Sequence, residues 1–137
     1  MTREEFIEWT KKMSVHIKEL DEQHKHLLNL INEANVYLEQ GKKGDLKKVL
    51  NSLVEYTRVH FSTEESYFKK WDYPFADEHM RAHAKLILSV LDYKDRFDKG
   101  EDIVFDLLVF LKGWWEVHIK IQDHKYSDYF TEKGYVE

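Results

Sequence analysis

The chain has no cysteine among its 137 residues. This absence excludes disulfide bonds, thiolate nucleophiles, zinc–thiolate sites, and iron–sulfur clusters or haem held by cysteine. It leaves the cellular compartment open, because a chain without thiols tolerates oxidising and reducing surroundings alike.

Proline and glycine are also scarce, with one proline and five glycines in the sequence. A collagen-like or low-complexity chain needs far more of both residues, and a sandwich of many short strands needs more turns. Disorder is excluded as well, because 42% of the residues are apolar and 15% are aromatic. The length is close to that of one ordinary domain, so we predict a single domain over residues 1–137.

The sequence lacks both a basic excess and a long apolar run. Its net charge is −5, whereas nucleic-acid-binding proteins usually carry a basic stripe that neutralises phosphates. No apolar run approaches the ~18 residues of a membrane span, and the first residues lack the apolar core of a secretory signal. We therefore expect a cytoplasmic protein that binds neither nucleic acid nor membranes.

Apolar residues recur at spacings of three and four in the segments between the breaks at 41–44, 72–74 and 98–100. This spacing predicts amphipathic helices, each with one stripe facing a shared core. Short connections make sequence neighbours antiparallel. We therefore predict an all-α fold, an up-down-up-down four-helix bundle, over about residues 19–124.

The two ends of the chain follow a different pattern. Residues 1–18 are predicted to form an N-terminal arm, in which Thr2 and Glu5 fit a capping box and Trp9 docks on the bundle. Residues 125–137 are predicted to form a short C-terminal tail. The pattern reveals no obvious exposed docking stripe for a partner. A monomer is the default expectation.

Polar residues interrupt the helical stripes at positions where leucine would be expected. A buried polar group costs free energy unless it is paired, and a single one is usually a core histidine with a partner. Several of them spread over all the predicted helices favour a shared metal ion instead. The six positions are His24, His60, Glu64, His79, His83 and His118.

Two of the spacings support a metal site. His79 and His83 are four residues apart, and His60 and Glu64 repeat this spacing with a carboxylate. Residues four apart lie on one helix face, so each pair presents two donors to the same point. The remaining two helices each supply a single histidine.

Asp123 is a further candidate ligand, although its spacing is less favourable. It follows His118 by five residues, which corresponds to about 140° around an ideal helix. It joins the same site only if the last turn is loosened or the side chain reaches round the helix.

The ligand set limits the choice of metal. Five imidazoles exclude calcium and magnesium, which prefer oxygen, and seven ligands are too many for one zinc ion. Iron, copper, nickel and zinc all accept imidazole with carboxylate. The set divides naturally over two octahedral metals if both carboxylates and one solvent oxygen bridge them, and one metal then keeps an open position.

The four segments that contain these residues resemble the motif set of the hemerythrin family, bacterial type, over nearly the whole chain. They are DEQHK at 21–25, HFSTEE at 60–65, HMRAH at 79–83 and WEVHIKIQD at 115–123. The resemblance implies a non-haem di-iron centre with an oxo or hydroxo bridge. The implied ligands are His79, His83 and His118 for a coordinatively full iron, His24 and His60 for an iron with an open position, and Glu64 and Asp123 as bridges.

Hemerythrins bind dioxygen reversibly, so the resemblance implies an oxygen-binding protein rather than an enzyme, used for oxygen carriage, storage or delivery. The other histidines, His16, His26 and His124, are expected to face outward and not to bind metal. An apolar pocket would protect the open position from water, and Ile121 is expected to lean over it. The pocket residues expected from helix geometry are Leu27, Leu28, Phe61, Trp114, Trp115 and Ile121.

Two other functions remain open at this point. A di-iron oxidase or peroxidase is one, although ferritin-like oxidases use Glu-x-x-His pairs and the chain contains none. The second is an oxygen or iron sensor that acts through a separate partner, because its metal site would look the same.

Overall fold

The structure is a computed structural model that describes residues 7–40 and 46–136. All regular elements within these ranges are helical, which confirms the predicted all-α bundle. The predicted loop at 41–44 and the predicted capping box of Thr2 and Glu5 lie outside the described residues. The elements are η1 (Lys11–Met13), α1 (Lys18–Gln40), α2 (Leu46–Lys70), α3 (Ala76–Asp98), α4 (Val104–Trp114), η2 (Trp115–Gln122) and α5 (Asp123–Glu132).

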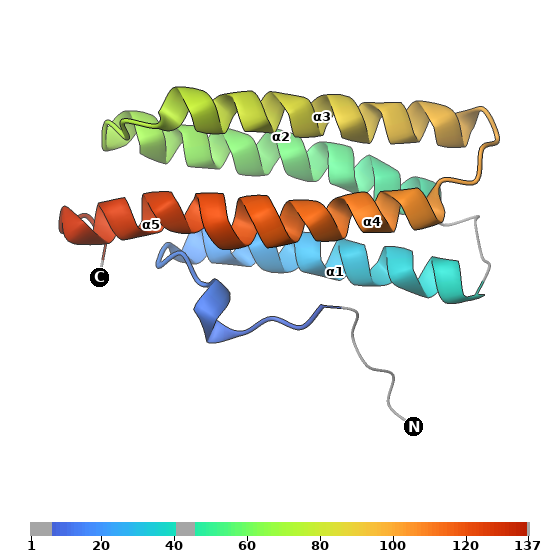
Figure 1. The fold of residues 1–137 in the computed structure, drawn as a ribbon, viewed down its shortest axis with the longest axis horizontal. Coiled ribbons are helices and arrows are strands. Elements are labelled where there is room, and N and C mark those ends of the chain that lie inside the picture. The colour runs from blue at the N-terminus through green and yellow to red at the C-terminus, as the bar shows by residue number, and fades with distance from the viewer. Residues whose placement is uncertain (1–6, 41–45, 137) are drawn as a thin grey trace.

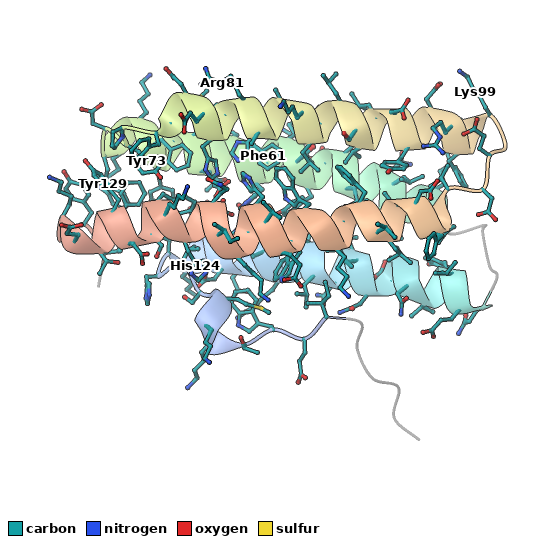
Figure 2. The ribbon with its side chains drawn as sticks, in the orientation of Figure 1. Phe61, Tyr73, Arg81, Lys99, His124 and Tyr129 are labelled. Carbon is teal, nitrogen blue, oxygen red and sulfur yellow. The ribbon has the colours of Figure 1, made fainter. Side chains whose placement is uncertain are left out.

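The bundle consists of four helical rods that lie side by side (Figure 1), and consecutive rods run antiparallel. Helices α1, α2 and α3 form three of them, and α4, η2 and α5 join end to end as the fourth. Figure 2 shows Phe61 inside the bundle, whereas Arg81 and Lys99 lie on its outer surface. No helix within the described ranges is both long enough and apolar enough to cross a membrane.

The apolar core is divided into two clusters along the bundle. The larger cluster is built mainly on aliphatic side chains, among them Leu27, Ile31, Leu107 and Leu111. The smaller cluster is mostly aromatic and includes Phe68. The candidate metal ligands lie between the two clusters in every rod, so a polar layer crosses the middle of an otherwise apolar core.

The fourth rod changes its helical form at this polar layer. Residues Trp115–Gln122 form a π-helix, which is stabilised by hydrogen bonds between residues five apart. At its end the backbone N–H of Asp123 donates to the carbonyl of His118. The π-helical turn is the loosened turn that the sequence required for Asp123 to share a face with His118.

The fourth rod also extends beyond its expected end at residue 124, because α5 continues to Glu132. Tyr126 and Phe130 are four residues apart and fully buried in the aromatic cluster. The sequence pattern predicted a tail from residue 125 onward. Burial of these two rings instead stabilises this segment as a helix.

The described part of the N-terminal arm, residues 7–17, is docked on the bundle, as predicted. The carboxylate of Asp21 accepts hydrogen bonds from the backbone N–H of Val15 at 2.8 Å and from the hydroxyl of Ser14 at 2.6 Å. Trp9 packs against the larger apolar cluster, and the ammonium group of Lys25 lies 5.2 Å from the centre of its ring. Asp21 thus fixes the arm where it enters α1.

Replacing Asp21 with alanine tests this anchor. The variant leaves the N–H of buried Val15 without its acceptor, so we expect the free energy of unfolding to fall by about 1–3 kcal/mol. Urea denaturation measures this change. Glu22→Ala is the matched control, because the ion pair of Glu22 with Lys25 is exposed, and such pairs contribute about 0–1 kcal/mol. Equal losses in the two variants would contradict the anchoring role of Asp21.

Candidate metal centre

The structure brings all seven predicted ligands together in the polar layer at the middle of the bundle. Each side chain is buried, with at most 6% of the residue exposed. The seven come from every rod: His24 from α1, His60 and Glu64 from α2, His79 and His83 from α3, His118 from η2 and Asp123 from the start of α5.

Three histidines and both carboxylates form one half of the cluster. Nε2 of His83 lies 3.0 Å from Oε1 of Glu64. Nε2 of His79 and Nε2 of His118 lie 3.0 and 3.1 Å from Oδ1 of Asp123. Ligand atoms of Glu64 and the three histidines all lie within 4.8 Å of one another, so they could hold one metal ion.

The other half contains two histidines and the same two carboxylates. Nε2 of His24 lies 3.1 Å from Nε2 of His60 and 3.0 Å from Oδ2 of Asp123. Nε2 of His60 lies 3.3 Å from Oε1 of Glu64. Ligand atoms of these four residues also lie within 4.8 Å of one another. Asp123 therefore directs one oxygen to each half, and Glu64 belongs to both.

The donor atoms fit a metal because the protein leaves them unpaired. Both carboxylate oxygens of Glu64 and of Asp123 are buried without a hydrogen-bond partner, and so is Nε2 of His79, His83 and His118. Unpaired buried polar atoms are costly, and these converge on the same small volume. Imidazole nitrogen and carboxylate oxygen together suit iron, and also copper, nickel or zinc.

Electrostatics within the cluster favour ionised carboxylates. Burial and each other's charge oppose ionisation, but the surrounding histidines lower the pKa of Glu64 and of Asp123 below their usual ranges. Burial lowers the pKa of His60 to about 3. Burial also acts to lower the pKa of His79, but its closeness to the carboxylates of Asp123 and Glu64 raises it to about 9. A positive charge between the two carboxylates is thus strongly stabilised.

Gln23, which the sequence pattern did not single out, orients one of the candidate ligands. Nδ1 of His60 donates to the side-chain oxygen of Gln23 at 2.6 Å, and the amide of Gln23 donates to the hydroxyl of Thr63 at 3.1 Å. This arrangement fixes the tautomer of His60 and directs the lone pair of Nε2 into the cluster. The signal was present in the sequence, since Gln23 lies within the motif that contains His24.

Aromatic rings hold further candidate ligands in place. The ring of Phe61 stacks on His83 with the ring centres 3.7 Å apart, and Trp114 stacks on His118 at 4.0 Å. Tyr56, four residues before His60, stacks on that ligand at 5.0 Å. These flat contacts restrict the imidazole planes, which favours a preformed site.

The expected apolar pocket residues occupy three different environments. Leu27, Leu28, Phe61 and Trp115 are buried in the larger apolar cluster, at the end of the core that adjoins the metal centre. Trp114 is half-buried and lines an outer cavity. Ile121 is 53% exposed, so the expectation that it leans over the open position is wrong. The expectation assumed an ideal α-helix, whereas in the π-helix the residue that shares a face with His118 is Asp123.

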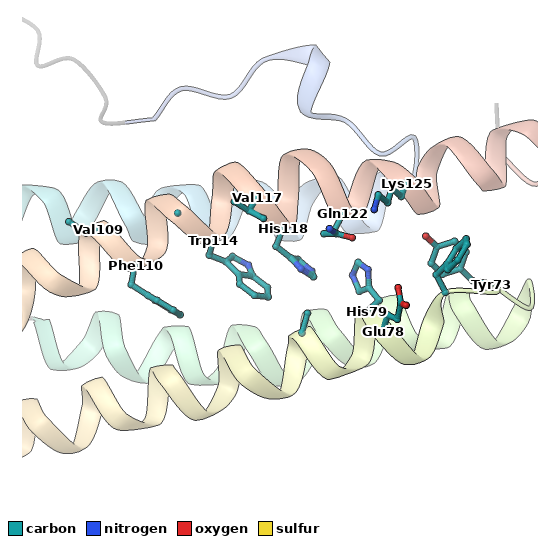
Figure 3. Close-up of a pocket in the computed structure, with 13 residues that line it drawn as sticks. Tyr73, Glu78, His79, Val109, Phe110, Trp114, Val117, His118, Gln122 and Lys125 are labelled. Carbon is teal, nitrogen blue, oxygen red and sulfur yellow. The ribbon is translucent and has the colours of Figure 1, made fainter.

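The outer cavity, with a volume of about 840 Å³, opens between α3 and the fourth rod (Figure 3). His79 and His118 lie at its inner side, so it adjoins the group of three histidines. A smaller cavity of about 360 Å³ lies beside His60, on the side of the group of two histidines, and is lined in part by Gln23 and Tyr56.

The remaining histidines lie outside the cluster. His16 and His26 are exposed. His124 is half-buried, and its Nε2 donates to the backbone carbonyl of Met13 at 3.4 Å. None of the three is among the residues that could hold a metal within the described ranges.

Comparisons with known proteins agree with this geometry. The sequence model of the family described as "Hemerythrin HHE cation binding domain" matches residues 15–130. The bacteriohemerythrin of Stenotrophomonas maltophilia is 32% identical over 120 residues, which cover 88% of this chain and 78% of that protein. The bacteriohemerythrin of Campylobacter jejuni is 32% identical over 130 residues, covering 90% and 94%. A crystal structure of wild-type hemerythrin superposes with a TM-score of 0.82 at 26% identity and covers 90% of this chain and 96% of that chain.

Replacing Gln23 with leucine tests its role in orienting His60. The loss of a hydrogen bond to a metal-binding histidine typically weakens metal binding about 10–100-fold, and we expect that loss here. Anaerobic titration with ferrous iron measures it. Asn51→Leu is the control, because it removes an exposed amide from α2, the helix that carries His60. Unchanged iron affinity in folded Gln23→Leu would contradict the orienting role.

Proposed function

Because the chain belongs to the hemerythrin family, we propose that its buried cluster holds two iron ions and binds dioxygen reversibly. The observation that carries this proposal is the position of Asp123. Its two oxygens face different histidine groups, at 3.0 Å from His79 on one side and 3.0 Å from His24 on the other. A carboxylate placed in this way is suited to bridge two metal ions.

The two metal positions are unequal in their protein ligands. We assign His79, His83 and His118 to one iron and only His24 and His60 to the other, with Glu64 and Asp123 shared. The poorer ligand set leaves room for a small molecule on the side of His24 and His60. Two ferrous ions would supply the electrons that dioxygen accepts on binding.

The surroundings of His24 and His60 favour binding without further reaction. Both histidines are fully buried. The ring of Trp115 contacts His24 edge-on, with the ring centres 6.4 Å apart. The ring centre of Phe61 lies 5.8 Å from that of His60. These rings and the adjacent apolar core shield the inner side of both histidines from water, which would otherwise displace the bound molecule. We therefore assign oxygen carriage, storage or delivery rather than an enzymatic reaction.

The absorption spectrum tests this function most simply. The iron-loaded protein is reduced without air, exposed to dioxygen and then returned to an inert atmosphere. We expect two irons per chain, a new visible absorption band in oxygen, and loss of the band when oxygen is removed. Immediate and irreversible oxidation at the first exposure would favour an oxidase instead.

Substitution of Glu64 tests the shared carboxylate. Glu64→Gln removes a negative charge and an oxygen donor from both metal positions, so we expect both irons to bind more weakly and the iron content to fall below two per chain. Metal analysis after desalting measures this. Glu65→Gln is the matched control, because Glu65 is the adjacent residue and is not among the candidate ligands. Two tightly bound irons in Glu64→Gln would exclude a bridging role.

Substitution of single histidines tests which side binds dioxygen. We expect His24→Ala to abolish oxygen binding even where some iron remains, because His24 belongs to the poorer ligand set. His79→Ala should instead lower the iron content first. Iron analysis and the oxygen-dependent spectrum separate the two effects, and His26→Ala, an exposed position on α1, serves as control. Reversible oxygen binding in His24→Ala would reverse the assignment of the open side.

A further inference from the structure

The outer face of the fourth rod carries a row of exposed apolar side chains. The exposed fractions are 64% for Phe105, 58% for Val109, 57% for Val117 and 53% for Ile121. These residues follow one another at intervals of four or eight, and Gly113 occupies the missing position in the middle. Single exposed apolar residues are ordinary, but four of them aligned along one helix face indicate an interaction surface.

The change from α-helix to π-helix keeps the row on one face. A spacing of four residues advances about 40° beyond a full α-helical turn, so a long row would wind around a regular helix. From Trp115 the turn is wider, because hydrogen bonds join residues five apart. In the wider turn, four residues fall short of a full turn, so the row rotates back around the helix axis. Val117 and Ile121 therefore stay on the exposed side.

The two ends of the apolar row are flanked by residues of opposite charge. Asp102 lies just before α4, and Lys125 lies in α5; both are exposed. The row is thus acidic at one end and basic at the other. The same face of a second copy, turned end to end, matches both charges at once.

Gly113 provides an independent observation. Glycine inside a helix costs about 1 kcal/mol relative to alanine. A Cβ at this position would meet no atom within 4 Å, so the fold of the single chain does not require a glycine here. A helix of another molecule that approaches closely would require one, because small residues at a crossing point let two backbones pack together.

We propose that this row is the interface of a homodimer in which α4 and η2 of two copies pack antiparallel around Gly113. The two-fold symmetry places Phe105 of one copy against Ile121 of the other, and Val109 against Val117. It pairs Asp102 with Lys125 at both ends, as expected for an isologous interface. The exposed charged residues beside the row form a polar rim.

The proposed dimer is independent of oxygen binding, because none of the residues in the row is a candidate metal ligand. Val109 and Val117 also border the cavity of about 840 Å³ between α3 and the fourth rod. The second copy therefore lies next to the mouth of this cavity. The proposed dimer departs from the monomer expected from the sequence.

Sedimentation equilibrium of the full-length, iron-loaded protein over a wide concentration range tests the proposal. We expect a monomer–dimer equilibrium, and Val109→Arg should raise the dissociation constant about 100-fold, because it buries a charged side chain against the apolar Val117 of the second copy. Leu88→Arg is the matched control, since Leu88 is 69% exposed but lies on α3. A wild-type protein that stays monomeric to roughly 1 mM, or a dimer that Leu88→Arg disrupts and Val109→Arg does not, would overturn the proposal.

A charge exchange tests the antiparallel arrangement itself. Asp102→Lys and Lys125→Asp should each raise the dissociation constant about tenfold or more through like-charge contacts. The double variant restores opposite charges and should return to within about threefold of the wild-type value. Circular dichroism establishes that each variant is folded. Failure of the folded double variant to recover would overturn the proposed packing.

Discussion

The structure depends on how the charge of a polar layer is neutralised inside an apolar bundle. Two ionised carboxylates and five imidazoles lie between the aliphatic and aromatic halves of the core, and all seven residues are buried. Burying an isolated carboxylate costs several kcal/mol, and here Glu64 and Asp123 share one small volume. Metal ions between them would offset this cost, so bound cations would also hold the four rods together.

The π-helical turn is the backbone feature that completes this layer. A regular α-helix would direct Asp123 well away from His118, and the oxygen ligand that faces both histidine groups would be lost. The turn places these residues on one face, and it also keeps Val117 and Ile121 on the outside of the rod. One local change in helical form thus shapes both the metal centre and the proposed contact with a second copy.

Much of this arrangement was predictable from the sequence. Spacings of three and four predicted the helices, and the paired spacing of His79 and His83 predicted a common site. Asp123 was assigned from the family motif, because ideal helix geometry does not predict a π-helical turn. The same limitation led to the wrong placement of Ile121. Gln23 was overlooked because its role depends on a contact between two helices, which spacing along one helix does not reveal.

We propose that one layer with shared carboxylates holds two metal ions. Crystallography of the iron-loaded protein, with anomalous diffraction measured at the iron edge, tests it most directly. We expect two iron peaks inside the bundle, with Glu64 and Asp123 between them, three histidines on one iron and two on the other. A single peak, or two peaks that share neither carboxylate, would contradict it.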